Sequence, residues 1–140
     1  MEVSVLKIWN ISKLILTRKD VPESDADVIA DSIIYANSRE KHTHGINRLP
    51  LYVQKIDKGL LNPRTPMELV SERPVVSVYD ANHGFGQVSA TKGMHVATEK
   101  ALNYGVGMVG VRNSNNFGTV SKQTANRFNR IRTLSNRLIC

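Results

Sequence analysis

Two histidines and an arginine stand close together in the first half of the chain. His42, His44 and Arg48 surround the junction between a polar loop and a helix predicted over residues 47–58. Histidine exchanges a proton near neutral pH without a shifted pKa, which suits a general acid or base facing a carbonyl or hydroxyl group. The four-residue spacing places His44 and Arg48 on one helix face, where a guanidinium could hold a carboxylate through two parallel N–H bonds. This equipment fits a 2-hydroxy-acid or 2-oxo-acid site, although spacing alone favours a surface pair without function.

Two other kinds of site have weaker support. His42 and His44 could share a zinc ion, but the only cysteine is at position 140 and the other histidines belong to other elements, so no metal site is predicted. Gly84-Phe85-Gly86 precedes a predicted helix, as a phosphate-binding loop would. The dinucleotide fingerprint also needs a third glycine, a preceding buried strand and an acid about 20 residues later. None of these is clear, and a plain turn is the preferred interpretation.

A polar run follows an apolar segment near the end of the recognisable pattern. Asn113, Ser114, Asn115 and Asn116 lead to Phe117 and Gly118. α/β proteins collect ligand-binding groups where a buried strand ends. A segment of this composition can equally be only a connection, so a binding loop and a plain loop stay equal alternatives.

The hydrophobic pattern of the first half predicts the elements that carry these residues. Residues 3–9 indicate a short strand that leads into a helix. A second helix is expected over residues 24–39, with Ser24 as its N-cap and apolar positions spaced by three and four. The helix over 47–58 ends at Gly59, which is placed as its C′ residue.

The second half predicts strands around one long helix. Residues 67–71 and 75–79 are β-leaning and could pair as a hairpin. A helix follows, with Gly105 at its end, and its core candidates are Val88, Met94, Ala97, Ala101 and Leu102. Residues 106–111 are apolar on both faces, as expected of an internal strand with helices packed on it. The order of elements indicates the α/β class.

The composition fits one globular domain. The chain has 140 residues, of which 41% are apolar and 22% charged, with a single cysteine. These values exclude a disordered, collagen-like or disulfide-stapled chain, and no apolar run approaches the roughly 18 residues of a membrane span. The N-terminus has an acid and no apolar signal region, so a cytoplasmic protein is expected.

The net charge of +7 comes from one end of the chain. Residues 1–99 contain 12 basic and 12 acidic side chains, whereas residues 100–140 contain seven basic side chains and no acid. A basic segment of this kind is typical of proteins that bind nucleic acid or an acidic surface. The excess describes the C-terminal end and not the fold.

Several separated motifs, in this order, resemble the type 2 malate/L-lactate dehydrogenases. The motifs are Ala26–Asp31, Thr43–Tyr52, Gly59–Pro63, Asp80–Gln87 and Val109–Gly118. The family comprises NAD(P)-dependent oxidoreductases of 2-hydroxy acids, including ureidoglycolate and sulfolactate dehydrogenases and cyclic imino-acid reductases. The resemblance runs from about residue 3 to residue 120. It implies a fold that is not Rossmann, with a mixed sheet and an N-terminal helical part.

The resemblance also implies roles for named residues. His44 matches the family histidine that protonates the substrate carbonyl oxygen, or takes the hydroxyl proton in the reverse reaction. Arg48 matches the residue that holds the substrate carboxylate, with Thr43 and Tyr52 lining the same pocket. Asn116 stands where the family usually has a second histidine tied to substrate binding or proton transfer. An asparagine hydrogen-bonds but exchanges no proton, so a different substrate preference or a reduced activity is expected.

Cofactor and partners are implied in the same way. The cofactor would be NAD or NADP, the substrate a small 2-hydroxy or 2-oxo acid, and the assembly a homodimer. Family members are more than twice as long as this chain, and most of their cofactor site lies in segments that it does not contain. We therefore expect residues 1–120 to be the N-terminal portion of such an enzyme, a truncated form with little or no activity, and the cofactor-binding residues stay unknown.

Residues 121–140 stand apart as a basic tail. They are rich in arginine and asparagine where the family continues with an alanine-rich helix, and one hypothesis is that they are read out of frame. The alternative function is a non-catalytic basic module. Phe128, Ile131, Leu134 and Leu138 are spaced for an amphipathic helix that would bind nucleic acid or an acidic surface. The absence of a nucleic-acid motif makes a nucleic-acid partner the less favoured expectation, and no membrane partner is expected.

Overall fold

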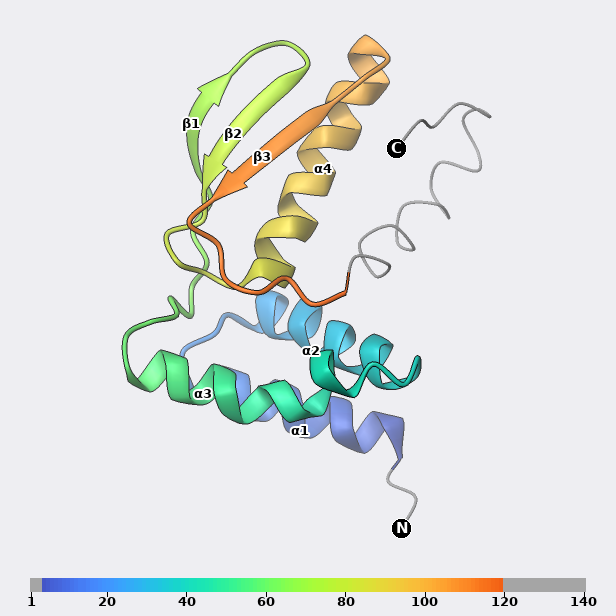
Figure 1. Ribbon diagram of the computed structural model, residues 1–140, viewed down its shortest axis with the longest axis vertical. Helices are drawn as coiled ribbons and strands as arrows, with labels where there is room; N and C mark the ends of the chain where they lie inside the picture. The colour runs from blue at the N-terminus through green and yellow to red at the C-terminus, as the bar shows by residue number, and fades with distance from the viewer. Residues whose placement is uncertain (1–3, 120–140) are drawn as a thin grey trace.

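The computed structural model describes residues 4–119, which form a helical part at one end and a sheet part at the other (Figure 1). The helical part contains α1 (Val5–Thr17), α2 (Glu23–Asn37), two short 3-10 helices η1 (His42–His44) and η2 (Ile46–Arg48), and α3 (Leu49–Asp57). The sheet part contains β1 (Glu68–Glu72), β2 (Val76–Asp80), α4 (Gly86–Tyr104) and β3 (Met108–Arg112). The predicted α/β class is confirmed, and the tail and Cys140 lie outside the described residues.

The sheet is mixed, with the strand order β1-β2-β3. β1 and β2 pair antiparallel, as the predicted hairpin requires, with a register shift between Leu69 and Ser71. β2 and β3 pair parallel, and α4 is the crossover between them. In this parallel pair Asp80 lies opposite Arg112, so the carboxyl ends of β2 and β3 meet at one edge.

The prediction that residues 106–111 form a strand covered on both faces is wrong for the described chain. β3 starts at Met108 and alternates between exposed and half-buried positions. Val109 and Val111 lie against Gly93 of α4, whereas Met108 is 62% exposed. The physical reason is that α4 covers one face only and β3 is the last strand of the described sheet.

The predicted strand at the start of the chain is also wrong. Residues from Val5 onward belong to α1, whose buried side carries Ser12 and Leu16, four residues apart. A helical period therefore decides the structure where a short alternation suggested a strand. The N-cap of the second helix lies two residues earlier than expected: Pro22 is the cap residue of α2, and Ser24 lies exposed in the first turn.

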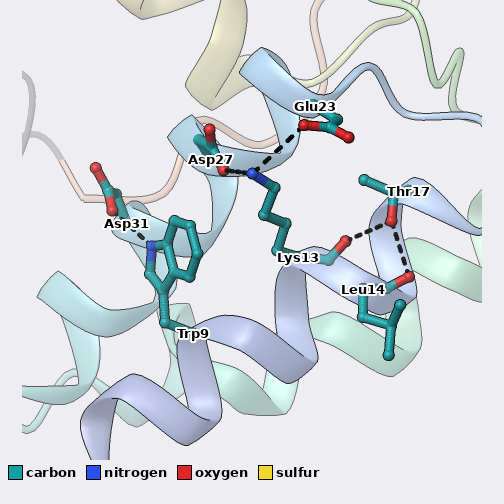
Figure 2. A network of polar contacts seen from close by, with 7 residues as sticks. All are labelled: Trp9, Lys13, Leu14, Thr17, Glu23, Asp27 and Asp31. Carbon is teal, nitrogen blue, oxygen red and sulfur yellow. Dashed lines mark hydrogen bonds and ion pairs between the residues drawn. The ribbon is translucent and has the colours of Figure 1, made fainter.

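A polar ladder joins α1 to α2 along their exposed side (Figure 2). Trp9 Nε1 donates a hydrogen bond of 2.8 Å to Asp31, and Lys13 Nζ lies 2.7 Å from an Asp27 carboxylate oxygen. The same ammonium lies 3.8 Å from Glu23 and 5.4 Å from the centre of the Trp9 ring. Lys13 and Asp27 are half-buried, whereas Glu23 and Asp31 are exposed and add little stability. Together these contacts connect α1 to α2.

The hydrophobic core lies where the helices meet the first turn of α4. Its buried members are Leu16, Val21, Ala26, Ile29, Ile33, Leu49, Tyr52, Leu61, Phe85 and Val88. Only the first half of α4 is buried, so Val88 belongs to the core as expected. Leu102 is 63% exposed, so its prediction as a core residue is wrong, because the later turns of α4 extend beyond the helical part (Figure 1).

The turn between β2 and α4 depends on two glycines that allow close packing. A Cβ atom at Gly84 would lie 2.6 Å from the Thr65 Cα atom, and one at Gly86 would meet the backbone of Asn115 and Asn116. The amides of this turn are already bonded, since Gly84 N donates to Ala81 O and Phe85 N donates to Thr65 Oγ1. This is a packed turn, with no free amide nest for a phosphate at these two groups.

Asp80 ties the carboxyl ends of β2 and β3 together. Its carboxylate accepts hydrogen bonds of 2.8 Å from Asn82 N, Arg112 Nε and Asn113 Nδ2. The Asn82 amide is the largest cause that holds the pKa of Asp80 below its usual value, and the Arg112 and Asn113 bonds act in the same direction. Asn82 and Asn113 both have positive φ angles, 48° and 50°, a conformation that asparagine tolerates.

Across residues 4–119, the structure contains no helix with the length and apolar character of a membrane span.

Gly86→Ala should destabilise the protein by about 1–3 kcal/mol, because the new methyl group meets backbone that cannot rotate away. Amide NMR shifts of Asn115 and Asn116 should change with it. The matched control is Gly59→Ala: that site has open space but a φ of 68°, so about 1 kcal/mol is expected without any shift at Asn115. A Gly86→Ala variant as stable as the wild type in urea unfolding would contradict the packing described.

Asp80→Asn should lower stability at neutral pH, and the gap to the wild type should close in acid. The folded pKa of Asp80 lies below its ordinary value of 3.8, so its contribution is fully present above that pH. It is lost as the pH falls through the folded pKa. Urea midpoints of both proteins from pH 7 to pH 2 measure this, with Glu99→Gln as a control for the removal of one exposed acid. A gap that stays constant over this range would refute the role of Asp80.

Candidate active site

The structure brings Thr43, His44 and Arg48 together through two 3-10 turns. His44 ends η1 and Arg48 ends η2, with Gly45 between them in an extended conformation (φ −89°, ψ −148°). The expectation that one continuous helix aligns His44 with Arg48 is therefore wrong. Arg48 instead folds back, and its Nε donates a hydrogen bond of 2.6 Å to the Thr43 carbonyl oxygen.

Gly45 fixes this double turn to the C-terminal end of α2. The side-chain oxygen of Asn37 accepts a hydrogen bond of 3.3 Å from Ile46 N, and a Cβ atom at position 45 would overlap it. A larger residue at position 45 would have to displace the Asn37 side chain, which would break its bond to Ile46 N. The turn that carries His44 and Arg48 is thus anchored to a helix of the core.

The Arg48 guanidinium keeps most of its donors unused. Within residues 4–119, the Thr43 carbonyl is its one acceptor, and it is bonded to Nε. Guanidinium carries five N–H donors in a planar fork that matches a carboxylate. The Arg48 side chain is therefore held in position on one side and can bind an anion with its remaining N–H groups.

His44 stands next to the carbonyl that holds Arg48, and it is half-buried. Its Nδ1 atom is buried and has no hydrogen-bond partner in the described part of the chain. A buried ring nitrogen without a partner is costly, and such groups in native structures call for a functional or ligand-related explanation. The side chain of His42 lies outside what the structure describes.

Tyr52 lies one helical turn after Arg48, and its ring belongs to the core. It is only 4% exposed and meets Phe85 edge to face, with ring centres 5.5 Å apart. Its hydroxyl oxygen accepts a hydrogen bond of 2.7 Å from Gln87 Nε2. Burial raises the pKa of Tyr52, while the Gln87 bond and the charge of Arg48 oppose that rise. The hydroxyl is thus the polar end of a core residue, and the Arg48 charge acts on it.

Asn116 lies on the loop that follows β3 and is exposed. Its side-chain oxygen accepts a hydrogen bond of 3.0 Å from Gly118 N, and no contact joins it to His44 or Arg48 in the described structure. Gly118 in turn packs beside Gln87, which bonds Tyr52. The loop therefore approaches the Arg48 corner through Gln87.

Asn115 anchors this loop, and no pattern in the sequence separates it from its neighbours. Its side chain donates a hydrogen bond of 2.7 Å to His83 O and accepts one of 3.2 Å from Lys55 Nζ on α3. Its backbone N donates to Gly84 O. A segment rich in asparagine signals a turn-rich loop, but only the fold reveals which of these residues crosses to other elements.

A cleft lies between α4 and β3. This cleft of about 590 Å³ is mainly apolar, and its lining includes Gly86, Ala90, Gly93, Val109 and Phe117.

Among residues 4–119 no group of three His, Cys, Asp or Glu side chains could hold a metal ion.

Comparison with known proteins gives a consistent result. The sequence model of the malate/L-lactate dehydrogenase family matches residues 3–128, past the boundary expected at residue 120. The L-sulfolactate dehydrogenase of Methanocaldococcus jannaschii is 41% identical over 117 residues, 81% of this chain and 34% of that protein. The malate dehydrogenase of Pyrococcus abyssi is 41% identical over 104 residues, 74% of this chain and 29% of its own length.

A solved structure shows the same fold. The sulfolactate dehydrogenase from M. jannaschii superposes with a TM-score of 0.89 at 34% identity, over 93% of this chain and 38% of that one. The chain spans about a third of the length of the relatives it matches. The match to the family model covers most of the chain, and the resemblance found in the motifs is confirmed: the chain belongs to the malate/L-lactate dehydrogenase family.

Proposed function

We propose that this chain supplies the substrate-binding corner of an NAD(P)-dependent oxidoreductase that interconverts a 2-hydroxy acid and a 2-oxo acid. The observation that carries the proposal is the Arg48 guanidinium, bonded to the Thr43 carbonyl beside His44 with its other N–H groups unused in the described chain. Relatives named for malate and for sulfolactate, both 2-hydroxy acids, support the same substrate class.

Arg48 binds the substrate carboxylate. A carboxylate accepts two parallel N–H bonds from a guanidinium, which fixes the orientation of the substrate as well as its position. The bond from Nε to Thr43 O limits the rotamers of the Arg48 side chain, so less conformational entropy is lost on binding. This anchor thus selects acids over neutral carbonyl compounds.

His44 exchanges the proton. In reduction of a 2-oxo acid the carbonyl oxygen gains a proton, and in oxidation of a 2-hydroxy acid the hydroxyl oxygen loses one. The carboxylate and the reacting oxygen are on adjacent carbons, so a substrate anchored at Arg48 has its reacting oxygen a short distance from the anchor. His44 follows the residue whose carbonyl holds Arg48, which suits it to meet that oxygen.

Asn116 contributes hydrogen bonding but no proton transfer. Its amide donates and accepts, but it does not titrate near neutral pH as a histidine does. With Asn116 in this position, proton transfer depends on His44 alone. Asn116 then favours acids whose substituent carries a hydrogen-bonding group.

The cofactor of the proposed reaction is a nicotinamide dinucleotide, NAD or NADP, which supplies or accepts the hydride. The turn at residues 84–85 offers no free amides for the phosphates of a dinucleotide. The Gly84 and Phe85 amides donate hydrogen bonds within the chain, and the backbone of Asn115 and Asn116 occupies the space beside Gly86. We therefore propose that the 140-residue chain on its own has little or no turnover.

Arg48→Met should weaken carboxylate binding. Oxamate, which mimics a 2-oxo acid, should bind the wild type and lose at least about tenfold in affinity in the variant, because hydrogen bonds to a charged group are lost. NMR titration or calorimetry measures the Kd, and Arg64→Met, an exposed arginine on the connector after α3, is the matched control. Equal affinities of the wild type and Arg48→Met would overturn the proposed anchor.

Turnover of the isolated chain should be absent. NADH and NADPH oxidation with a panel of 2-oxo acids and cyclic imino acids should stay at the level of a protein-free blank. The reason is that the cofactor-binding site is incomplete. His44→Ala runs beside the wild type. Turnover that disappears in His44→Ala would contradict the expected inactivity, and it would mean that the chain completes a cofactor site.

A further inference from the structure

Gln87 is the buried polar residue that joins the helical part to the sheet part. It lies in the first turn of α4 and is 1% exposed. Its Nε2 donates a hydrogen bond of 2.7 Å to the Tyr52 hydroxyl oxygen on α3, 35 residues earlier in the chain. Its Oε1 is buried and has no partner among the described residues.

The direction of the bond from Gln87 to Tyr52 determines whether the Tyr52 hydroxyl hydrogen is available to another acceptor. A tyrosine hydroxyl has one hydrogen to donate and two lone pairs that accept. Because Gln87 donates to the oxygen, the hydroxyl hydrogen is left for another acceptor. Within residues 4–119 the Tyr52 hydroxyl donates to no acceptor.

The N–H donors of Arg48 that no described residue uses point to the chemistry of the missing acceptor. Arg48 lies one turn before Tyr52, and its charge favours the ionised form of the tyrosine, so the guanidinium and the hydroxyl share one electrostatic environment. A single anion with two oxygens can accept hydrogen bonds from both groups. A carboxylate meets this description, with one side on the guanidinium and one oxygen toward the phenol.

We propose that Gln87 is a positioning residue that turns the Tyr52 hydroxyl into a hydrogen-bond donor for the substrate carboxylate held by Arg48. The inference rests on the proposed function. It adds the Gln87 side-chain amide as the group that directs the Tyr52 hydroxyl hydrogen toward the substrate. Gln87 acts through Tyr52 and has no contact with the substrate.

The surroundings of Gln87 hold its amide in place. A Cβ atom at Gly118 would lie 3.5 Å from Gln87 Cγ and 2.8 Å from Ser32 Oγ, so the loop after β3 packs directly against this side chain. Ser32 is 1% exposed, and its hydroxyl also has no partner in the described chain. Buried polar atoms left unpaired are costly, which argues against glutamine as a simple core filler at this position.

A double-mutant cycle on oxamate binding tests the proposal. Tyr52→Phe keeps the ring contact with Phe85 and removes only the hydroxyl, and oxamate affinity should fall about tenfold. Gln87→Met removes the amide donor at similar volume and should also weaken binding, by at least about threefold, because the hydroxyl is then free to turn. In the Tyr52→Phe background, Gln87→Met should change the Kd by less than about twofold.

A spectroscopic measurement tests the Gln87–Tyr52 bond independently of oxamate binding. Tyrosine ¹³Cζ shifts followed with pH should give a higher pKa for Tyr52 in Gln87→Met than in the wild type, since the lost bond favoured the ionised form. Gln87→Glu, which is isosteric, accepts the hydroxyl hydrogen instead of donating, and it should weaken oxamate binding more than Gln87→Met. Tyr35 in the same spectra is the internal control.

The outcomes separate the two proposals. Three results would overturn the role of Gln87 while the Arg48 anchor stands: wild-type oxamate affinity in Gln87→Met, an equal loss from Gln87→Met with and without Tyr52→Phe, or an unchanged Tyr52 pKa. If the wild type fails to bind oxamate, the proposed function fails, and with it the carboxylate as the acceptor. If Gln87→Met does not fold, Gln87→Glu and Tyr52→Phe still complete the comparison.

Discussion

The contact between α3 and the first turn of α4 holds the molecule together as one unit. Tyr52 inserts its ring beside Phe85 and receives a hydrogen bond from Gln87, so apolar and polar contacts lie on the same side chain. The three N-terminal helices and the sheet part have their common core at this point. Because Arg48 lies one turn from Tyr52, the same contact also decides where the guanidinium is. The position of the candidate site therefore follows from the packing of the core.

Two glycines extend this arrangement to the loops on either side. Gly45 lets the turn with His44 pass against Asn37 of α2, and Gly86 lets the loop after β3 pass over the start of α4. In both cases a methyl group would meet atoms of a segment outside the glycine's own turn. The backbone is thus held at van der Waals contact near the site, which keeps the polar groups in place without many direct hydrogen bonds between them.

Local patterns predicted part of this structure. The hairpin and the two helices that end at a glycine follow from short-range chemistry, and the structure has all of them. The fold class and the family also came from the order of elements and motifs. Two failures depended on distant packing: Leu102 extends past the core, and β3 has one covered face. Two were local, since the chain from Val5 is helical and Pro22 caps α2 in place of Ser24. Within the site, the proximity of His44 and Arg48 was expected, but Gly45 breaks the helix assumed to align them. Gln87 ends one of the motifs that resemble the family, but its bond to Tyr52 has no sequence signal, because the two residues are 35 positions apart.

A structure of the chain with oxamate is the most direct test of the assignment of the Arg48 corner as the substrate site. We expect the carboxylate of oxamate on the Arg48 guanidinium, with one oxygen about 2.7 Å from the Tyr52 hydroxyl and the amide carbonyl facing His44. Oxamate seated in the cleft between α4 and β3, with the Arg48 corner free of it, would contradict that assignment.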